Sequence, residues 1–143
     1  MNAALVAALI FTVVLLVVTT YFLMGSVPLL ILKHDTTLDS RFIGGFLKTY
    51  YTSASYTALA TAMSYAFSGQ FTLSVGAIGL AAVAATLKRT IIPKMESLRW
   101  RIEAGDSKAI AAFRLLHTKA IMINLTQLAL IVWGLIDLSM QMR

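Results

Sequence analysis

Four long apolar stretches, separated by short polar or charged segments, dominate the pattern of the chain. They cover about residues 3–32, 46–67, 71–92 and 117–137. A helix that crosses a membrane needs about 20 mostly apolar residues, and each stretch is long enough. The pattern predicts an all-α fold, an integral membrane four-helix bundle, with residues 1–143 forming a single transmembrane domain.

The first stretch, residues 3–32, contains no charged side chain. It is longer than the apolar region of a signal peptide, no basic segment precedes it, and no small-residue cleavage site follows it. We therefore expect a retained membrane span whose last turn contains Pro28.

The segment between the third and fourth stretches is predicted to be helical. Apolar residues recur there at helical spacing, at Ile91, Met95, Leu98 and Ile102. Gly105 is expected to end one helix, and Asp106 or Ser107 to cap the next. Helices over residues 71–104 and 107–140 would each be about 50 Å long, against about 30 Å for the bilayer core. We expect them to extend into the cytoplasm as a long hairpin.

Composition places the chain outside the soluble class. Hydrophobic residues make up 59% and charged residues 13%, with a mean hydropathy of +0.81, whereas soluble domains carry about 25% charged residues. The absence of cysteine excludes disulfides, thiolate metal sites and a cysteine nucleophile. The six carboxylates are scattered, which argues against most acid–base catalysis.

The basic residues gather at two of the three connections. Three flank the first connection, eight lie within residues 88–119, and the turn at residues 68–70 has none. The positive-inside rule places both basic connections in the cytoplasm and both termini in the periplasm of a bacterial inner membrane. The net charge of +6 then indicates anionic lipid rather than nucleic acid. Contacts with anionic headgroups or an acidic partner are expected from five basic residues, Lys88, Arg89, Lys94, Arg99 and Arg101. Arg99 and Glu103 are expected to form an i,i+4 pair that supports the helix.

Polar side chains at membrane depth are the candidate functional residues, because burying them in lipid is costly. Arg114, His117 and Asn124 fall on one face of the fourth helix, and Gln127 lies further round. Further polar and aromatic residues, Lys48, Tyr50 and Tyr51, lie near the start of the second apolar stretch. The predicted cluster comprises Arg114, His117, Asn124, Gln127, Lys48, Tyr50 and Tyr51.

Two interpretations of His117 remain open. It could be a haem or metal ligand or a proton relay, with His34 at the same end as the second ligand. Alternatively, it is an interfacial histidine that hydrogen-bonds to Tyr50 or Tyr51. No dinucleotide-binding, phosphate-binding, zinc-protease or serine-nucleophile motif is present, so no catalytic residue and no cofactor is assigned, and haem or a metal at these histidines is the alternative.

Small residues on the second helix predict its position in the bundle. Alanine recurs at i,i+4 spacing, at Ala54, Ala58, Ala62 and Ala66. Small side chains allow helix backbones to approach closely inside a membrane. We therefore expect this helix to lie at the centre.

Three segments resemble a known family. They are residues 41–51 (RFIGGFLKTYY), residues 88–93 (KRTIIP), and residues 104–130, which contain the histidine, asparagine and glutamine described above. They are similar to the bacterial form of the transmembrane protein 205 family (domain of unknown function 4149). The resemblance implies four spans but no established chemistry; animal relatives are linked to platinum-drug tolerance and membrane export. In its four-span size and a histidine at a helix end, the chain more distantly resembles copper-resistance D proteins and the small haem-binding protoporphyrinogen oxidase. It departs from the latter, because the Asn-Glu pair expected where Leu116-His117 stands is missing.

These observations favour a non-enzymatic integral membrane protein, an accessory subunit or exporter-like module of unknown substrate. Its expected partners are the bilayer, anionic headgroups, and a larger membrane complex or further copies of the chain. The alternative is a haem- or metal-binding membrane redox protein that uses His117 and His34. A transport path along the hydroxyl-rich second helix would require an oligomer, because 143 residues leave little room for a pore.

Overall fold

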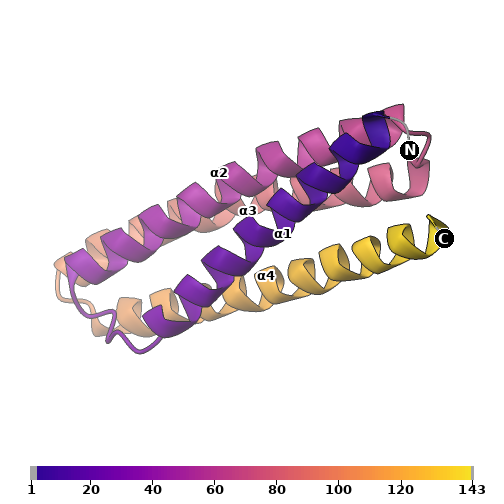
Figure 1. Cartoon of the computed structure of the whole chain (residues 1–143). Coiled ribbons are helices and arrows are strands. Elements are labelled where there is room, and N and C mark those ends of the chain that lie inside the picture. The colour runs from indigo at the N-terminus through magenta and orange to yellow at the C-terminus, as the bar shows by residue number, and fades with distance from the viewer. Residues whose placement is uncertain (1–2, 143) are drawn as a thin grey trace.

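The computed structural model describes residues 3–142 and contains four α-helices; residues 1, 2 and 143 of the predicted domain lie outside the described part. The helices are α1 (Ala3–Leu29), α2 (Thr37–Phe67), α3 (Phe71–Glu103) and α4 (Ser107–Gln141). They run alternately up and down (Figure 1). The predicted all-α fold with four helices is confirmed.

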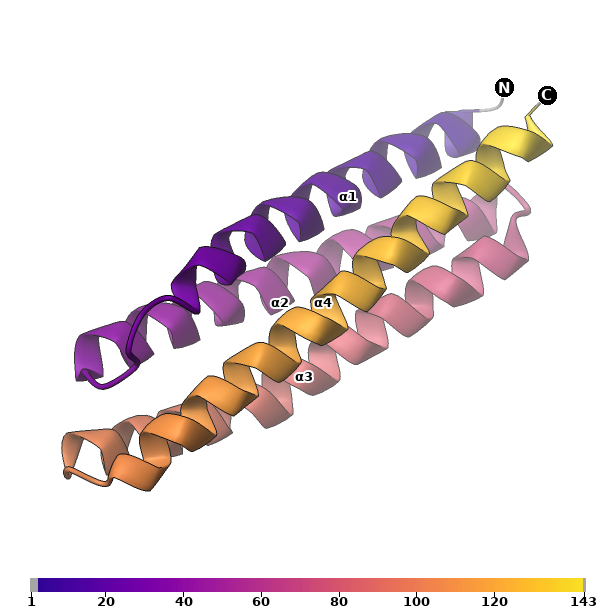
Figure 2. The same ribbon diagram turned by 90° about the horizontal axis from the view of Figure 1, so that it is seen from below.

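The two long connections lie at the same end of the bundle. Figure 2 shows the α1–α2 and α3–α4 connections together, with both chain termini at the opposite end beside the α2–α3 turn. We call these the connection end and the terminal end. The basic residues of the two connections therefore occupy one end of the molecule.

The helix ends follow local sequence signals. Gly69 and Gly105 adopt φ values of +80° and +85°, which glycine tolerates without steric cost. The Asp106 carboxylate accepts a hydrogen bond of 3.0 Å from the backbone N–H of Lys108 and so caps α4. The predicted helix stop and cap are confirmed, and the ends of α3 and α4 lie within one residue of the prediction.

The predicted Arg99–Glu103 ion pair is wrong. Within residues 3–142 the ion pair joins Arg101 to Asp106 at 2.6 Å. Asp106 is held in place by its capping role, directly within reach of Arg101. Arg99 instead lies over the ring of Trp100, 5.3 Å from its centroid.

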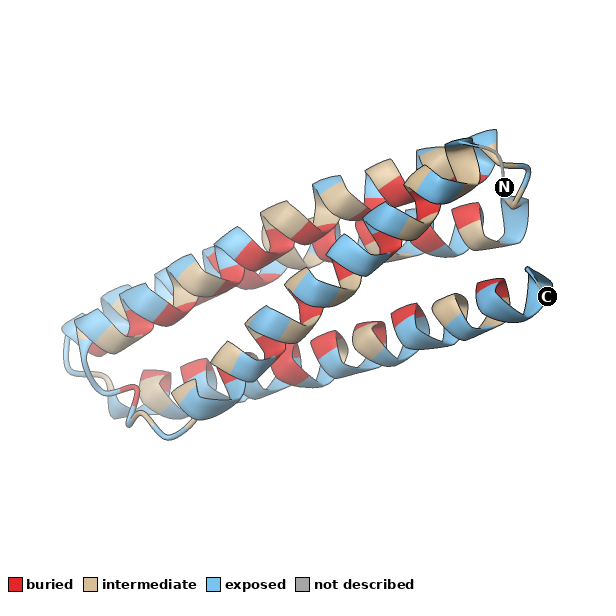
Figure 3. Ribbon diagram, viewed as in Figure 1, coloured by how far each residue is buried: buried red, intermediate tan, exposed pale blue. Residues whose placement is uncertain are grey.

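Helix α2 packs against both α1 and α3, more extensively than α4 packs against the same two helices. Ala54, Ala58 and Ala62 are buried at these contacts, whereas Ala66, near the end of the helix, is exposed. Figure 3 shows the buried positions on the inward faces of the helices. The small side chains allow close approach of the helix backbones.

The α3–α4 hairpin is packed rather than free at the connection end. Ile91, Met95 and Ile102 are buried, as their helical spacing predicts. They belong to the same hydrophobic cluster as Ile43 and Leu47. The first turns of α2 therefore cover the inner side of the hairpin.

Three of the described helices are long and apolar enough to cross a membrane: α1, α3 and α4. Helix α2 is long enough but less apolar, because its serine, threonine and tyrosine residues lower its hydropathy. Residues 46–67, predicted as the second span, belong to this helix.

Candidate functional site

Two histidines meet inside the bundle near the connection end. His34 lies in the α1–α2 connection and His117 on α4, and both are 0% exposed. The Nε2 atom of His34 is 3.2 Å from Nδ1 of His117. The fold thus joins two residues that are 83 positions apart.

The backbone of His34 is strained. Its φ of +61° lies in the left-handed region, which costs a residue with a Cβ atom about 1–2 kcal/mol. This backbone conformation accompanies a ring that is fully buried against α4. Strain of this kind persists where the surrounding contacts enforce it.

Two residues of α4 hold the connection in place. The ring of Phe113 lies 5.9 Å from that of His34, measured between centroids. Nη2 of Arg114 donates a hydrogen bond of 3.0 Å to the carbonyl oxygen of Leu30. Because Phe113 and His117 are four residues apart, they lie on one face of α4, and both contact the His34 ring from that side.

The environment favours the neutral form of the His34 ring. Burial lowers the pKa of His34 from 6.5, and the Arg114 charge adds to this effect. A hydrogen bond to the backbone carbonyl oxygen of Leu32 and the carboxylates of Asp39 and Asp35 oppose it. Within the described chain, Nε2 of His117 has no hydrogen-bond partner. One N–H accounts for the contact between Nε2 of His34 and Nδ1 of His117.

The other predicted polar residues lie deeper along the bundle. The Tyr50 hydroxyl donates a hydrogen bond of 3.1 Å to Oε1 of Gln127, and both residues are buried. Asn124 is 0% exposed, and in the described chain neither atom of its amide group has a hydrogen-bond partner; the same is true of the Tyr51 hydroxyl. A buried polar group without a partner lowers the free energy of unfolding by about 1–3 kcal/mol. The buried Asn124 and Tyr51 side chains therefore destabilise the fold.

The expected hydrogen bond from His117 to Tyr50 or Tyr51 is wrong. His34 occupies that position instead, because the connection turns inward at its left-handed residue. Tyr50 is bonded to Gln127. The structure therefore brings together His34 and His117, and separately Tyr50 and Gln127.

Two members of the predicted cluster are on the surface. Lys48 is exposed and lines a hollow of about 180 Å³ together with Glu96 and Arg99. The Arg114 side chain is also exposed and contacts the connection rather than the interior. The basic residues expected to contact lipid are exposed or half-buried on the half of α3 nearest the connection end, at Lys88, Arg89, Lys94, Arg99 and Arg101.

The inward face of α1 was not predicted from the sequence. Thr12, Thr19 and Ser26 are buried and recur every seven residues in a helix without charge. Within the described residues, the hydroxyl of Ser26 has no hydrogen-bond partner. In an apolar helix the few polar positions, rather than the apolar ones, mark the side that faces the bundle, and this spacing was the available signal.

The histidine pair has the spacing of two adjacent metal ligands. Zinc–nitrogen bonds of about 2.0–2.1 Å in a tetrahedral site separate adjacent nitrogens by roughly 3.4 Å, close to the observed 3.2 Å. Within residues 3–142 there is no group of three or more histidine, cysteine or acidic side chains that could complete such a site. An ion there would take the place of the proton shared between the rings.

Haem does not fit between these rings as they lie. Axial nitrogens on opposite sides of an iron would be about 4 Å apart, and the porphyrin would separate the two imidazoles. Here the two nitrogens are within hydrogen-bond distance. No known protein family, curated protein or solved structure matches this chain.

Proposed function

We propose that the chain is a four-span protein of the bacterial inner membrane, with the connection end in the cytoplasm and both termini in the periplasm. Three apolar helices and the basic residues gathered at one end support this topology. The resemblance to the transmembrane protein 205 family supports it too. The hairpin of α3 and α4, covered by the first turns of α2, would protrude beyond the headgroups.

The polar content of α2 is compatible with a fourth crossing. Its hydroxyls donate to the carbonyl oxygens one turn earlier, which removes most of the cost of placing a hydroxyl in lipid. Such bonds of 2.7–2.9 Å are formed by Thr52, Ser55, Thr61 and Ser64. Because α2 packs against both α1 and α3, it would cross the membrane beside them.

Cysteine labelling tests this topology directly, since the natural chain contains no cysteine. We expect an impermeant maleimide added to intact cells to label Ser68→Cys but not Lys94→Cys. Permeabilised cells, in which both variants are labelled, provide the control. Labelling of Lys94→Cys in intact cells would overturn the proposal.

We propose further that the protein acts without catalysis, as an accessory subunit or exporter-like module. The observation that supports this role most directly is that buried polar residues, among them His34 and His117, lie at the same end of the bundle as the exposed basic residues. The surface formed by those basic residues would bind anionic headgroups or an acidic partner, and the strained connection over His34 would couple the surface to the interior.

Co-purification from native membranes tests the accessory role. We expect a stoichiometric partner to be retained by the natural chain and lost from a variant with Lys94, Arg99 and Arg101 changed to glutamine. The control changes Arg143 to glutamine. Purification of the natural chain without any stoichiometric partner would refute this role.

A second candidate function is the binding of a transition metal ion, which the 3.2 Å separation of His34 and His117 favours. We expect purified protein to bind one Zn²⁺ ion, supplied alone, and to be stabilised by about 2.7 kcal/mol at a concentration 100 times Kd. His34→Gln and His117→Gln should each abolish binding, whereas Asn124→Ala should preserve it. Zinc binding that survives both histidine changes would exclude this site.

The absorption spectrum separates metal from haem. The direct contact of the imidazoles predicts no Soret band in protein purified from its native membrane. A Soret band that disappears in His117→Ala would show that the two rings separate to admit a porphyrin.

A further inference from the structure

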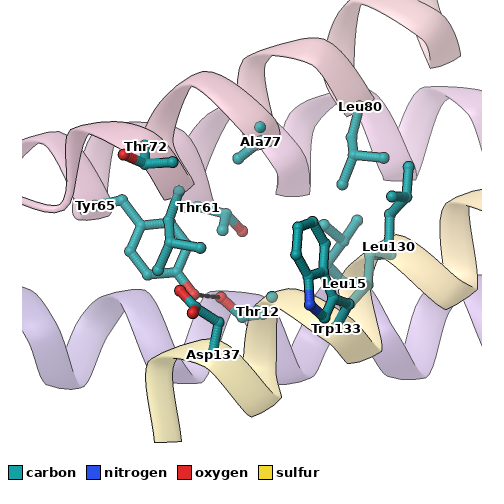
Figure 4. Close-up of a pocket in the computed structure, with 14 residues that line it drawn as sticks. Thr12, Leu15, Thr61, Tyr65, Thr72, Ala77, Leu80, Leu130, Trp133 and Asp137 are labelled. Atoms are coloured by element: carbon teal, nitrogen blue, oxygen red, sulfur yellow. Dashed lines mark hydrogen bonds between the residues drawn. The ribbon is translucent and has the colours of Figure 1, made fainter. Parts of the chain in front are cut away.

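A second polar feature lies at the terminal end, away from the histidines. A pocket of about 310 Å³ opens there between all four helices, at the lower end of the range of about 300–1,000 Å³ for ligand pockets. Its polar and aromatic lining includes Thr12, Thr61, Tyr65, Trp133 and Asp137, with Gly76 in the wall (Figure 4).

Among the residues that the structure describes, the pocket carries one negative charge without a cationic partner. Asp137 is half-buried, and it is the one charged side chain in residues 3–32, 49–87 and 120–142 taken together. One of its oxygens accepts a hydrogen bond of 2.7 Å from Nε2 of Gln141. In the described chain it forms no ion pair, since the ion pair there joins Arg101 to Asp106.

Two hydroxyls of the pocket, those of Tyr65 and Thr61, present acceptors rather than donors. The Thr12 hydroxyl donates to the carbonyl oxygen of Ala8 at 2.7 Å, so the 2.8 Å bond between Thr12 and Tyr65 uses the tyrosine proton. The Thr61 hydroxyl donates to the carbonyl oxygen of Thr57. With these protons committed, the oxygens of Tyr65 and Thr61 can only accept.

The rest of the pocket is apolar and aromatic. Leu15, Leu80 and Leu130 line it, and Figure 4 shows the indole of Trp133 standing among them while the Asp137 carboxyl group lies beside the Tyr65–Thr12 hydrogen bond. An indole face attracts cations. A ligand that suits the whole pocket therefore has an apolar body and a positively charged, hydrogen-bond-donating head.

We propose that this pocket binds a small lipophilic ammonium compound, with its ammonium group on Asp137 and its apolar body between α3 and α4. Charge complementarity selects this class, because an anion or a neutral acyl chain leaves the carboxylate unpaired. The site goes beyond the function proposed above and does not depend on it. Cysteine labelling and co-purification report on that function without involving this pocket.

The test uses Trp133 fluorescence in phosphatidylcholine nanodiscs, in a Trp100→Phe background that leaves Trp133 as the sole indole. Three probes share one skeleton and differ in charge: phenylbutylammonium, phenylbutanol and phenylbutyrate. We expect saturable binding of the ammonium compound, at least about tenfold tighter than that of the alcohol, and no saturable binding of the carboxylate.

Two variants locate the binding. Asp137→Asn keeps the shape of the side chain and should weaken ammonium binding at least about tenfold, whereas Glu96→Gln at the connection end should leave it unchanged. Gly76→Leu should block the pocket and abolish binding without disturbing the fold, since a Cβ atom at Gly76 meets no atom within 4 Å. An unchanged thermal midpoint checks the fold of each variant.

Three results would overturn the proposal. The ammonium compound and the alcohol could saturate at equal concentrations, Asp137→Asn could bind as well as the natural chain, or no probe could saturate at all. The first two would identify the pocket as a groove for lipid acyl chains, and the third as a space that takes no such ligand.

Discussion

Replacing His34 by glycine and by alanine measures the backbone strain at the histidine pair. Both changes remove the imidazole and its 3.2 Å contact with His117, so the two variants differ only in one methyl group. That methyl group must occupy a backbone with φ of +61°. A residue with a Cβ atom pays about 1–2 kcal/mol in this region, and glycine does not.

The expected difference follows from two opposing terms. Glycine avoids the steric cost but loses more conformational entropy on folding, by roughly 0.5–1 kcal/mol. We therefore expect His34→Gly to be more stable than His34→Ala by about 1 kcal/mol. Both should be less stable than the natural chain, because Nδ1 of His117 loses its partner at a cost of about 1–3 kcal/mol.

The assay is reversible unfolding in mixed micelles, with the free energy of unfolding measured for each variant. A matched pair at Ser97, an exposed position within α3, provides the control: there glycine should be less stable than alanine by about 1 kcal/mol. The sign of the difference should reverse between the two sites. An alanine variant at His34 that equals or exceeds the glycine variant would refute the left-handed conformation.

Three further predictions concern pH, packing and capping. Burial lowers the pKa of His34 from 6.5, so the unfolded chain gains this proton first as the pH falls. The free energy of unfolding should therefore decrease below pH 6.5, by at most about 1.4 kcal/mol per pH unit from this residue. His34→Asn should flatten the dependence of the free energy of unfolding on pH. Ala58→Leu should destabilise the bundle by about 1–3 kcal/mol in chemical denaturation, since Ala58 is buried between helices, whereas Ala66→Leu at an exposed position should have little effect. Asp106→Ala removes both the cap and the partner of Arg101 and should speed amide hydrogen exchange in the first turn of α4, while Asp106→Asn, which retains a capping oxygen, should do so less.

The ends of α3 and α4 could be predicted from the sequence, because the signals that end a helix are local. The start of α2 was not predicted: the helix begins at Thr37, nine residues before the apolar stretch at residue 46, because Thr36 caps a polar first segment. Gly105 ends α3 through its positive φ, and Asp106 caps α4 through its own carboxylate. The concentration of basic residues at two connections could be seen in the same way. Each of these features depends on residues only a few positions apart.

The inward faces were only partly predictable. On α2 the alanine spacing indicated the buried side, because small residues stand out among tyrosines and hydroxyls. On α1 nearly every residue is apolar, so the apolar pattern has no preferred side, and only Thr12, Thr19 and Ser26 mark the face that the fold buries.

Tertiary structure alone decided which polar groups meet. The contact between His34 and His117 depends on the left-handed turn of one connection and on the alignment of α1 with α4, and neither is encoded in a short stretch of sequence. The same holds for the pocket that all four helices form around Asp137. Local sequence sets helix periodicity and helix ends, whereas long-range side-chain contacts arise from the packing of whole helices, to which every residue at the interfaces contributes.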